Sequence, residues 1–338
     1  MTGQRMLRIL GVVVCVVLAG WFVKRCVIPD PRLFLQFIIT GIMLGSIFSV
    51  VALGWVLIYK CSGVLNLAMG ELTMIGGYVC LSLYSYFVGS IFKDSITTAF
   101  LFALGFTILV GLILGLLTER IFLRKMIGEP ILAVIMVTVG LSFFFKGAIF
   151  IVWDTDTQNF KPDVFPGGHI GFIEQYLGIA VGQVYLWSFI AAIVLMIIFV
   201  SFFKYTRWGL SMQACADDEM AALSLGVSAK FVYAMAWAIA FMSAGVGGTL
   251  LGNINGLNYS VGHYGLLVLP VVVFGGLNSI PGAIVGGITI GILQNLSGGY
   301  LDGIVGASTK EIAPFVFMVI FLLFKPFGLW GWERIERV

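Results

Sequence analysis

The chain has 338 residues, of which 60% are apolar and 10% charged, and its formal net charge is +3. Soluble domains carry about 25% charged residues, so this composition excludes a soluble enzyme, a disordered chain and a nucleic-acid-binding protein. The apolar residues form continuous runs rather than alternating strands, and they suffice for about ten helices of the ~20 residues that span a membrane. We therefore expect an all-α, polytopic transmembrane helical bundle of about ten spans, folded as a single domain over residues 1–338.

The first apolar run resembles a secretion signal, because Arg5 and Arg8 precede it. Bulky and basic residues from Trp21 to Arg25 stand where a small-residue cleavage site would be required, which favours a retained helix. The predicted spans cover residues 9–28, 33–58, 66–88, 97–118, 131–153, 184–203, 231–252, 263–277, 282–297 and 311–325.

Lys and Arg residues indicate the orientation, because they gather on the cytoplasmic side of membrane proteins. With the N-terminus in the cytoplasm and the spans alternating, the basic residues are biased about two to one toward that side. Both termini are then cytoplasmic, residues 154–183 form an outer, periplasmic loop, and residues 204–230 form a cytoplasmic loop. The basic residues Lys24, Arg25 and Arg32 oppose this placement of the first helix.

The cytoplasmic loop at 204–230 has the pattern of a short helix. Arg207-Trp-Gly leads into an Ala-rich segment that ends at Gly226. The acidic residues Asp217, Asp218 and Glu219 suit the early part of a helix, and a glycine suits its C-terminal end. We predict one short cytoplasmic helix that is too polar to span.

A motif G-x-L-N-x-x-x-G occurs twice, at residues 63–70 and 275–282. Asn and Gly tolerate the backbone angles that break a helix, Asn can cap the next one, and Pro281 suits the first turn that follows. Both copies are expected on the cytoplasmic side, as tight turns between spans or as broken, re-entrant helices that line a substrate path. Under the second interpretation the path residues are Asn66, Gly70, Glu71, Gly275, Gly276 and Asn278.

Two charges are predicted inside spans, and ionisable groups there commonly mark pathways or internal pairs. Glu71 follows the first break and also suits a helix N-terminus, while Lys146 could instead extend toward the interface. His263 is predicted at the outer end of a span. Acidic and histidine residues form no chain across the membrane, so proton-driven transport is not favoured. The cysteines lack a C-x-x-C pattern and the two histidines lie far apart, so no metal or cofactor is expected.

The loop pattern Ala216-x-Asp218-x-x-x-Ala222-x-x-x-Gly226 resembles the cytoplasmic coupling loop of ABC importer permeases. Together with residues 63–78 and 275–287, it makes the chain similar to the Liv-type permeases for branched-chain amino acids from about residue 33 to 330. Many members of that family begin near the position of Leu33, so residues 9–28 would be an extra N-terminal helix.

The resemblance implies a permease of the bacterial inner membrane, in contact with lipid. Its partners would be a second homologous permease, two cytoplasmic ATPases and a periplasmic binding protein. The chain has no G-x-x-x-x-G-K-[ST] motif, so it is not expected to be an enzyme. A helix would place Asp218, Ala222 and Gly226 on one face, where small residues allow close docking to an ATPase. The expected ATPase-coupling residues are Ala216, Asp217, Asp218, Ala222, Leu225 and Gly226.

Two other classes of function compete with this one. A stand-alone channel or ion-coupled carrier for a small neutral solute, such as urea or an amide, would leave residues 204–230 as a solvated loop. An intramembrane enzyme would need paired carboxylates, a Ser/His pair or a metal cluster, and the sequence shows none of these patterns. The leading hypothesis is an importer subunit for branched-chain amino acids or related small amphipathic solutes.

Overall fold

The computed structural model describes residues 30–331, apart from residues 94, 166 and 307. Within these residues the chain is helical, and isolated bridges join Gln158 to Leu257 and His169 to Gly182. The helices in chain order are α2 (Pro31–Ser62), α3 (Met69–Ser90), α4 (Ile96–Ile121), η2 (Leu123–Met126), α5 (Ile131–Trp153), α6 (Gly171–Leu177), α7 (Gln183–Tyr205), α8 (Arg207–Asp217), α9 (Glu219–Ser224), α10 (Ala229–Asn255), α11 (Ser260–Leu266), α12 (Val268–Gly275), α13 (Ile280–Val305) and α14 (Thr309–Phe324).

The longest helix, α2, shows how local signals set the ends of a span. The Asp30 carboxylate accepts the Leu33 N–H at 3.2 Å, and Pro31 occupies the first helical position. Gly63 ends the helix with a left-handed φ of 67°, and its N–H donates to the Tyr59 carbonyl. Its 32 residues extend for about 48 Å, which exceeds the ~30 Å hydrocarbon core of a bilayer.

Seven of the described helices are long and apolar enough to cross a membrane, fewer than the ten spans predicted. The predicted span at 9–28 lies outside the described residues. The one at 263–277 is divided between two short helices, α11 and α12, which together cover Ser260–Gly275. The one at 311–325 corresponds to α14, which has only 16 residues. The all-helical membrane fold is confirmed, and the count of ten is not.

Glycines let the central helices touch backbone to backbone. A Cβ on Gly45 of α2 would lie 2.5 Å from the Gly287 carbonyl oxygen of α13. On the other side of the bundle, a Cβ on Gly115 of α4 would lie 2.6 Å from the Ala238 Cα of α10. Small residues at such crossings allow the close approach that stabilises membrane helix pairs. These contacts explain why α2 and α10, which are apolar enough to face lipid, are instead mostly buried inside the bundle.

The peripheral helices α4, α5 and α7 expose apolar side chains instead. Less than a third of the most apolar window of each is buried, as expected for faces that contact lipid or another subunit. The strongly exposed apolar residues on these helices include Phe102, Leu132, Met136, Phe143, Ile151 and Ile197.

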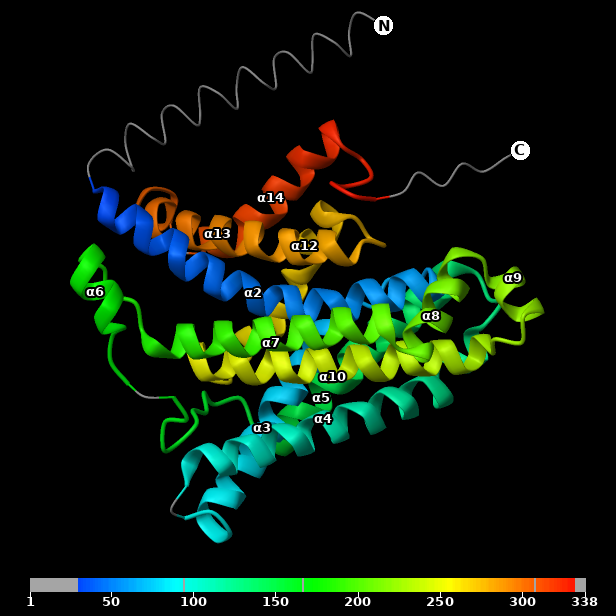
Figure 1. Cartoon of the computed structure of the whole chain (residues 1–338), viewed down its shortest axis with the longest axis horizontal. Helices are drawn as coiled ribbons and strands as arrows, with labels where there is room; N and C mark the ends of the chain where they lie inside the picture. Colours follow the sequence, from blue (N-terminus) through cyan, green and yellow to red (C-terminus); the bar gives the residue numbers. More distant parts are fainter. Residues whose placement is uncertain (1–29, 94, 166, 307, 332–338) are drawn as a thin grey trace, which may run out of the picture.

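The two loops predicted on opposite sides of the membrane lie at opposite ends of the bundle. Figure 1 shows α6 at one end of α7, and α8 with α9 at the other. Near α8 and α9, the Cys61 thiol at the end of α2 contacts the Met212 carbonyl of α8. Helix α13 runs antiparallel to α2, because Gly41 lies against Ile292 and Gly45 against Ile288. Helix α13 therefore leads away from the end that carries α8 and α9.

Candidate functional site

The first break, between α2 and α3, folds back into the bundle. The Trp55 indole N–H of α2 donates to the Asn66 carbonyl at 2.8 Å, so the chain returns beside α2 before α3 begins. Asn66 is only 1% exposed, and its side-chain oxygen accepts the Ala68 N–H at 3.0 Å. The expectation that Asn66 caps α3 is wrong, because Ala68 holds the cap position. Asn66 stabilises the preceding turn, as short polar side chains often do.

The second break, between α12 and α13, is a tight turn. Gly275 ends α12, and a Cβ there would overlap the Gly282 carbonyl. Gly276 adopts a φ of 110°, which other residues rarely adopt. The Ser279 hydroxyl, and not Asn278, caps α13 by accepting the Gly282 N–H at 3.1 Å.

Two further observations concern this second break. Pro281 lies in the first turn of α13, as predicted. The segment after α14 covers the turn: the Leu329 N–H donates to the Phe274 carbonyl at 2.9 Å, and the Trp330 N–H donates to the Gly275 carbonyl at 3.1 Å. These hydrogen bonds satisfy two backbone carbonyls at the end of α12, and they hold the segment after α14 over the turn.

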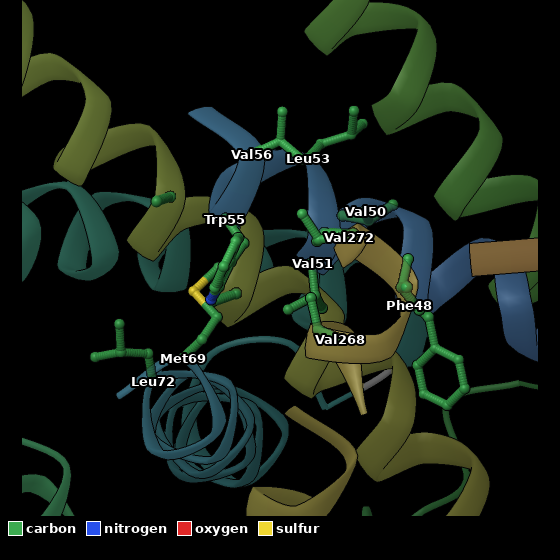
Figure 2. Close-up of a cluster of buried hydrophobic side chains, with 14 of the residues drawn as sticks. Phe48, Val50, Val51, Leu53, Trp55, Val56, Met69, Leu72, Val268 and Val272 are labelled. Carbon is green, nitrogen blue, oxygen red and sulfur yellow. The ribbon is translucent and has the colours of Figure 1, made fainter. Parts of the chain in front are cut away.

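Both breaks contact α2, but they do so at different places. The first meets α2 at Trp55, whereas the Ser49 hydroxyl of α2 donates to the Ile284 carbonyl near the start of α13 at 3.0 Å. Figure 2 shows Trp55 beside Met69 of α3, and Val51 close to Val268 of α12, within one buried apolar cluster. Among the described residues, no hydrogen bond joins the predicted path residues of one break to those of the other.

Glu71 lies in the first turn of α3 and is 9% exposed. Its Oε2 is buried without a hydrogen-bond partner. Ser142 and Lys146 of α5 and His263 of α11 are close enough to the carboxyl group to interact with it. No ion pair joins Lys146 to Glu71. The Lys146 Nζ lies 3.4 Å from the Tyr259 hydroxyl and 4.5 Å from the centre of that ring.

The predicted cytoplasmic helix is two helices rather than one. Asp218 breaks the segment and caps α9 by accepting the Ala221 N–H at 2.9 Å. An Asp carboxylate competes for backbone N–H groups in this way, which ends α8 and starts α9. The expectation that Asp218, Ala222 and Gly226 share one face is therefore wrong. Ala222 is buried, whereas Gly226 lies beyond α9 with a φ of 85°.

The pair α8–α9 is packed against the bundle and has an apolar outer surface. Met212, Cys215 and Ala222 are buried in one cluster with residues from the ends of α2, α7 and α10. Facing outward, Met220 is 74% exposed and Leu225 is 84% exposed. Met220 was not predicted as a site residue, although apolar residues in an otherwise polar loop were a detectable signal. Of the other predicted coupling residues, Ala216 is half-buried and Asp217 is exposed.

A small cavity of about 120 Å³ opens near the same end of the molecule. Its lining comes from the end of α2, the connection between α4 and α5, and α10, and it includes Glu119 and Glu129. The carboxylate of Glu119 is paired with Arg124 at 2.9 Å, the only ion pair within the described part of the chain. None of the six predicted path residues lines this cavity.

Comparison with known proteins identifies the family. The profile of the family described as branched-chain amino acid transport system / permease component matches residues 37–324. The permease protein LivH of the high-affinity branched-chain amino acid transport system of Salmonella typhimurium is 31% identical over 314 residues, which cover 90% of this chain and 98% of LivH. The corresponding protein BraD of Pseudomonas aeruginosa is 27% identical, over 92% of this chain and all of BraD.

The family match runs through both breaks and through the α8–α9 region, from the second turn of α2 to the end of α14. These matches agree with the resemblance read from the sequence motifs. The chain therefore belongs to the family of permease components of branched-chain amino acid transport systems.

Proposed function

We propose that this chain forms part of the membrane path of an ATP-driven importer for branched-chain amino acids or related small amphipathic solutes. Family membership and the names of LivH and BraD support this substrate class. Permease components of ABC transporters do not hydrolyse ATP; partner ATPases do, which agrees with the lack of an ATP-binding motif in the sequence.

The assembly proposed here pairs the chain with a second homologous permease, two cytoplasmic ATPases and a periplasmic binding protein. Members of the family work in complexes with ATPase and binding-protein partners. Homologues are permeases of the inner membrane. We place the α8–α9 end of the bundle and both termini in the cytoplasm, and the α6 end in the periplasm. The basic residues of the cytoplasmic loops support that orientation.

The observation that carries the proposal is the form of α8 and α9. One side of this pair is buried against the ends of three spanning helices, and the other side exposes Met220 and Leu225 to the surroundings. An exposed apolar patch at the end of a packed element is typical of a protein-docking surface. Closure of an ATPase pair against α8 and α9 would move the ends of α2, α7 and α10 together. This is the behaviour expected of an ATPase-coupling element, whose proposed residues are Ala216, Asp217, Asp218, Ala222, Leu225 and Gly226.

The substrate path is proposed to run beside the two breaks. Asn66, Gly70 and Glu71 would supply its polar side, because a buried turn and an unpartnered carboxyl oxygen lie there. Gly275 and Gly276 would hold the start of α13 in place through the tight turn, in which Asn278 also lies. Non-helical backbone at membrane depth is tolerated where it is buried in protein or lines a cavity.

Co-purification tests the proposed coupling surface. The full chain, tagged and expressed with its partner subunits, is purified in a mild detergent, and the bound ATPase subunits are quantified. We expect Met220→Asp combined with Leu225→Asp to reduce bound ATPase at least tenfold, because two charges would be buried in an apolar contact. The matched control is Tyr176→Asp on α6, an exposed side chain at the opposite end of the bundle.

Two results would contradict the proposal. Full ATPase recovery with the double variant would exclude α8–α9 as the docking surface. Solute uptake by the purified chain without any ATPase would favour a stand-alone channel or carrier.

A further inference from the structure

Helices α3, α5 and α11 bring polar and ionisable side chains together at one place in the bundle, separate from the tight turn between α12 and α13. Gly70 of α3 lies against α11: a Cβ on Gly70 would overlap the Gly262 carbonyl, and a Cβ on Gly265 would overlap Gly70 itself. This backbone contact sets Glu71, the next residue of α3, beside His263 of α11. Helix α5 completes the group with Ser142 and Lys146, which are one helical turn apart.

Opposite charges are present in this group but are not paired with each other. Glu71 is a buried residue, and its Oε2 has no hydrogen-bond partner. The Lys146 ammonium instead contacts Tyr259, at 3.4 Å from the hydroxyl and over the ring face. The His263 ring packs edge-on against the same tyrosine, with 4.8 Å between ring centres. A carboxylate with one unpartnered oxygen thus lies near an ammonium and an imidazole.

The surroundings of this group argue against a lipid-facing position. Placing a charged side chain in the hydrocarbon core costs at least about 2.5 kcal/mol, and such residues usually face a bundle interior or a water-filled path. The Lys146 ammonium reaches Tyr259, the residue that precedes α11. His263 and Tyr259 are exposed in the isolated chain, so the group can be reached from outside it.

We infer that Glu71, Lys146 and His263 form a binding site for the charged ends of a zwitterionic amino acid. The Glu71 carboxylate would accept hydrogen bonds from the α-ammonium group, and Lys146, with the Tyr259 hydroxyl and His263, would donate to the α-carboxylate. This inference rests on the proposed function, and it names the residues that would bind the transported amino acid. A zwitterion pairs both charges without adding net charge, whereas urea or an amide leaves the carboxylate and the ammonium unpaired.

The test measures leucine uptake by the complete transporter. Proteoliposomes carry the full chain with its permease partner and ATPases, and the L-leucine-loaded binding protein is added on the periplasmic side. We expect Glu71→Gln and Lys146→Met each to lower the uptake rate at least tenfold while the complex stays assembled. The controls are Glu174→Gln on α6 and Lys93→Met between α3 and α4, which are exposed and far from the group, and which should leave uptake within twofold of the unchanged protein.

The outcomes separate the site from the function on which it rests. If the unchanged complex transports no amino acid, the proposed function fails. If it transports leucine and both variants do so equally well, the function stands and the site is wrong. Loss of the permease partner from both variants would instead assign the group to subunit pairing and overturn the site.

Thiol labelling supplies a measurement that a purely structural role would not change. In the assembled complex, Ser142→Cys should react with a membrane-impermeant thiol reagent, and saturating L-leucine should slow that reaction at least threefold. Urea at the same concentration should not slow it. The unchanged chain reports background labelling, and its described cysteines Cys61, Cys80 and Cys215 are buried. Reaction rates that leucine leaves unaltered, or that urea slows equally, would contradict the site.

Discussion

The two copies of G-x-L-N-x-x-x-G form different structures from nearly the same residues. In the copy at 63–70, the asparagine is buried and bonded within the turn, and the following helix leads directly to Glu71. In the copy at 275–282, the first and last glycines meet backbone to backbone, and a serine caps the helix. The motif therefore specifies a break between two helices. The neighbouring elements determine whether hydrogen bonds or close backbone packing stabilise that break.

The largest expected effect is at the second break. Gly275→Val would force a side chain into the Gly282 backbone, and no flexible group is present to move away. We expect a loss of more than about 4 kcal/mol, seen as loss of monodisperse protein in detergent. Gly303→Val is the matched control, because a Cβ there meets nothing within 4 Å. If both variants purify equally well, the second break is not closed by packing.

The second-largest expected effect is the difference in stability cost between replacing the asparagine of the first motif copy and replacing that of the second. Asn66→Ala removes the acceptor for the buried Ala68 N–H and should cost about 1–3 kcal/mol. Asn278→Ala should cost less than about 0.5 kcal/mol, because Asn278 is half-buried and its side chain makes no hydrogen bond among those of the described residues. Thermal unfolding of the two purified variants compares them directly. Equal shifts in Tm would show that the two asparagines play the same role.

A smaller effect is expected from the bond that holds the first break to α2. Trp55→Phe retains an aromatic ring but deletes the N–H that donates to the Asn66 carbonyl. The loss should be about 1 kcal/mol, and it should not add fully to Asn66→Ala, since both act on one turn. A double-mutant cycle on Tm measures this coupling. Full additivity would contradict a shared role.

The smallest effect is expected at the cap of α13. Ser279→Ala removes the acceptor for the Gly282 N–H and should cost about 1 kcal/mol or less, since the tight glycine contact remains. Ser279→Thr keeps the hydroxyl and is the control. A decrease in Tm larger than that of Asn66→Ala would mean that the cap, rather than packing, holds the second break.

Local signals predicted much of the fold. The apolar runs that became α2 to α5, α7 and α10 were predicted correctly, because a continuous apolar segment in a membrane has few alternatives to a helix. Pro281 was recognised as a start signal because proline suits the first helical turn, and the glycines of the motif were recognised as helix-breaking because they tolerate unusual backbone angles. Two divisions were not predicted: that of residues 263–277 into α11 and α12, and that of residues 204–230 at Asp218. Each division lies within a segment whose sequence pattern is that of one continuous helix.

Contacts between distant segments could not be predicted. The sequence shows that Gly70, Gly262 and Gly265 are small, but not that α3 and α11 cross there. The proximity of Glu71 to His263 follows from that crossing, and its proximity to Lys146 follows from the packing of α5 against α3, so both relations appear only in three dimensions. Likewise, the cover that residues 329–330 place over Gly275 depends on the path of α14.

The most direct test of the central claim, that α8–α9 couples ATP hydrolysis to transport, is ATP-dependent uptake of L-leucine into proteoliposomes containing the complete transporter. Asp218→Leu removes the cap of α9, and Gly226→Val places a branched side chain at a φ of 85°. The account predicts that each variant inserts and assembles but loses at least nine-tenths of uptake. Uptake equal to that of the unchanged protein by both variants would contradict it.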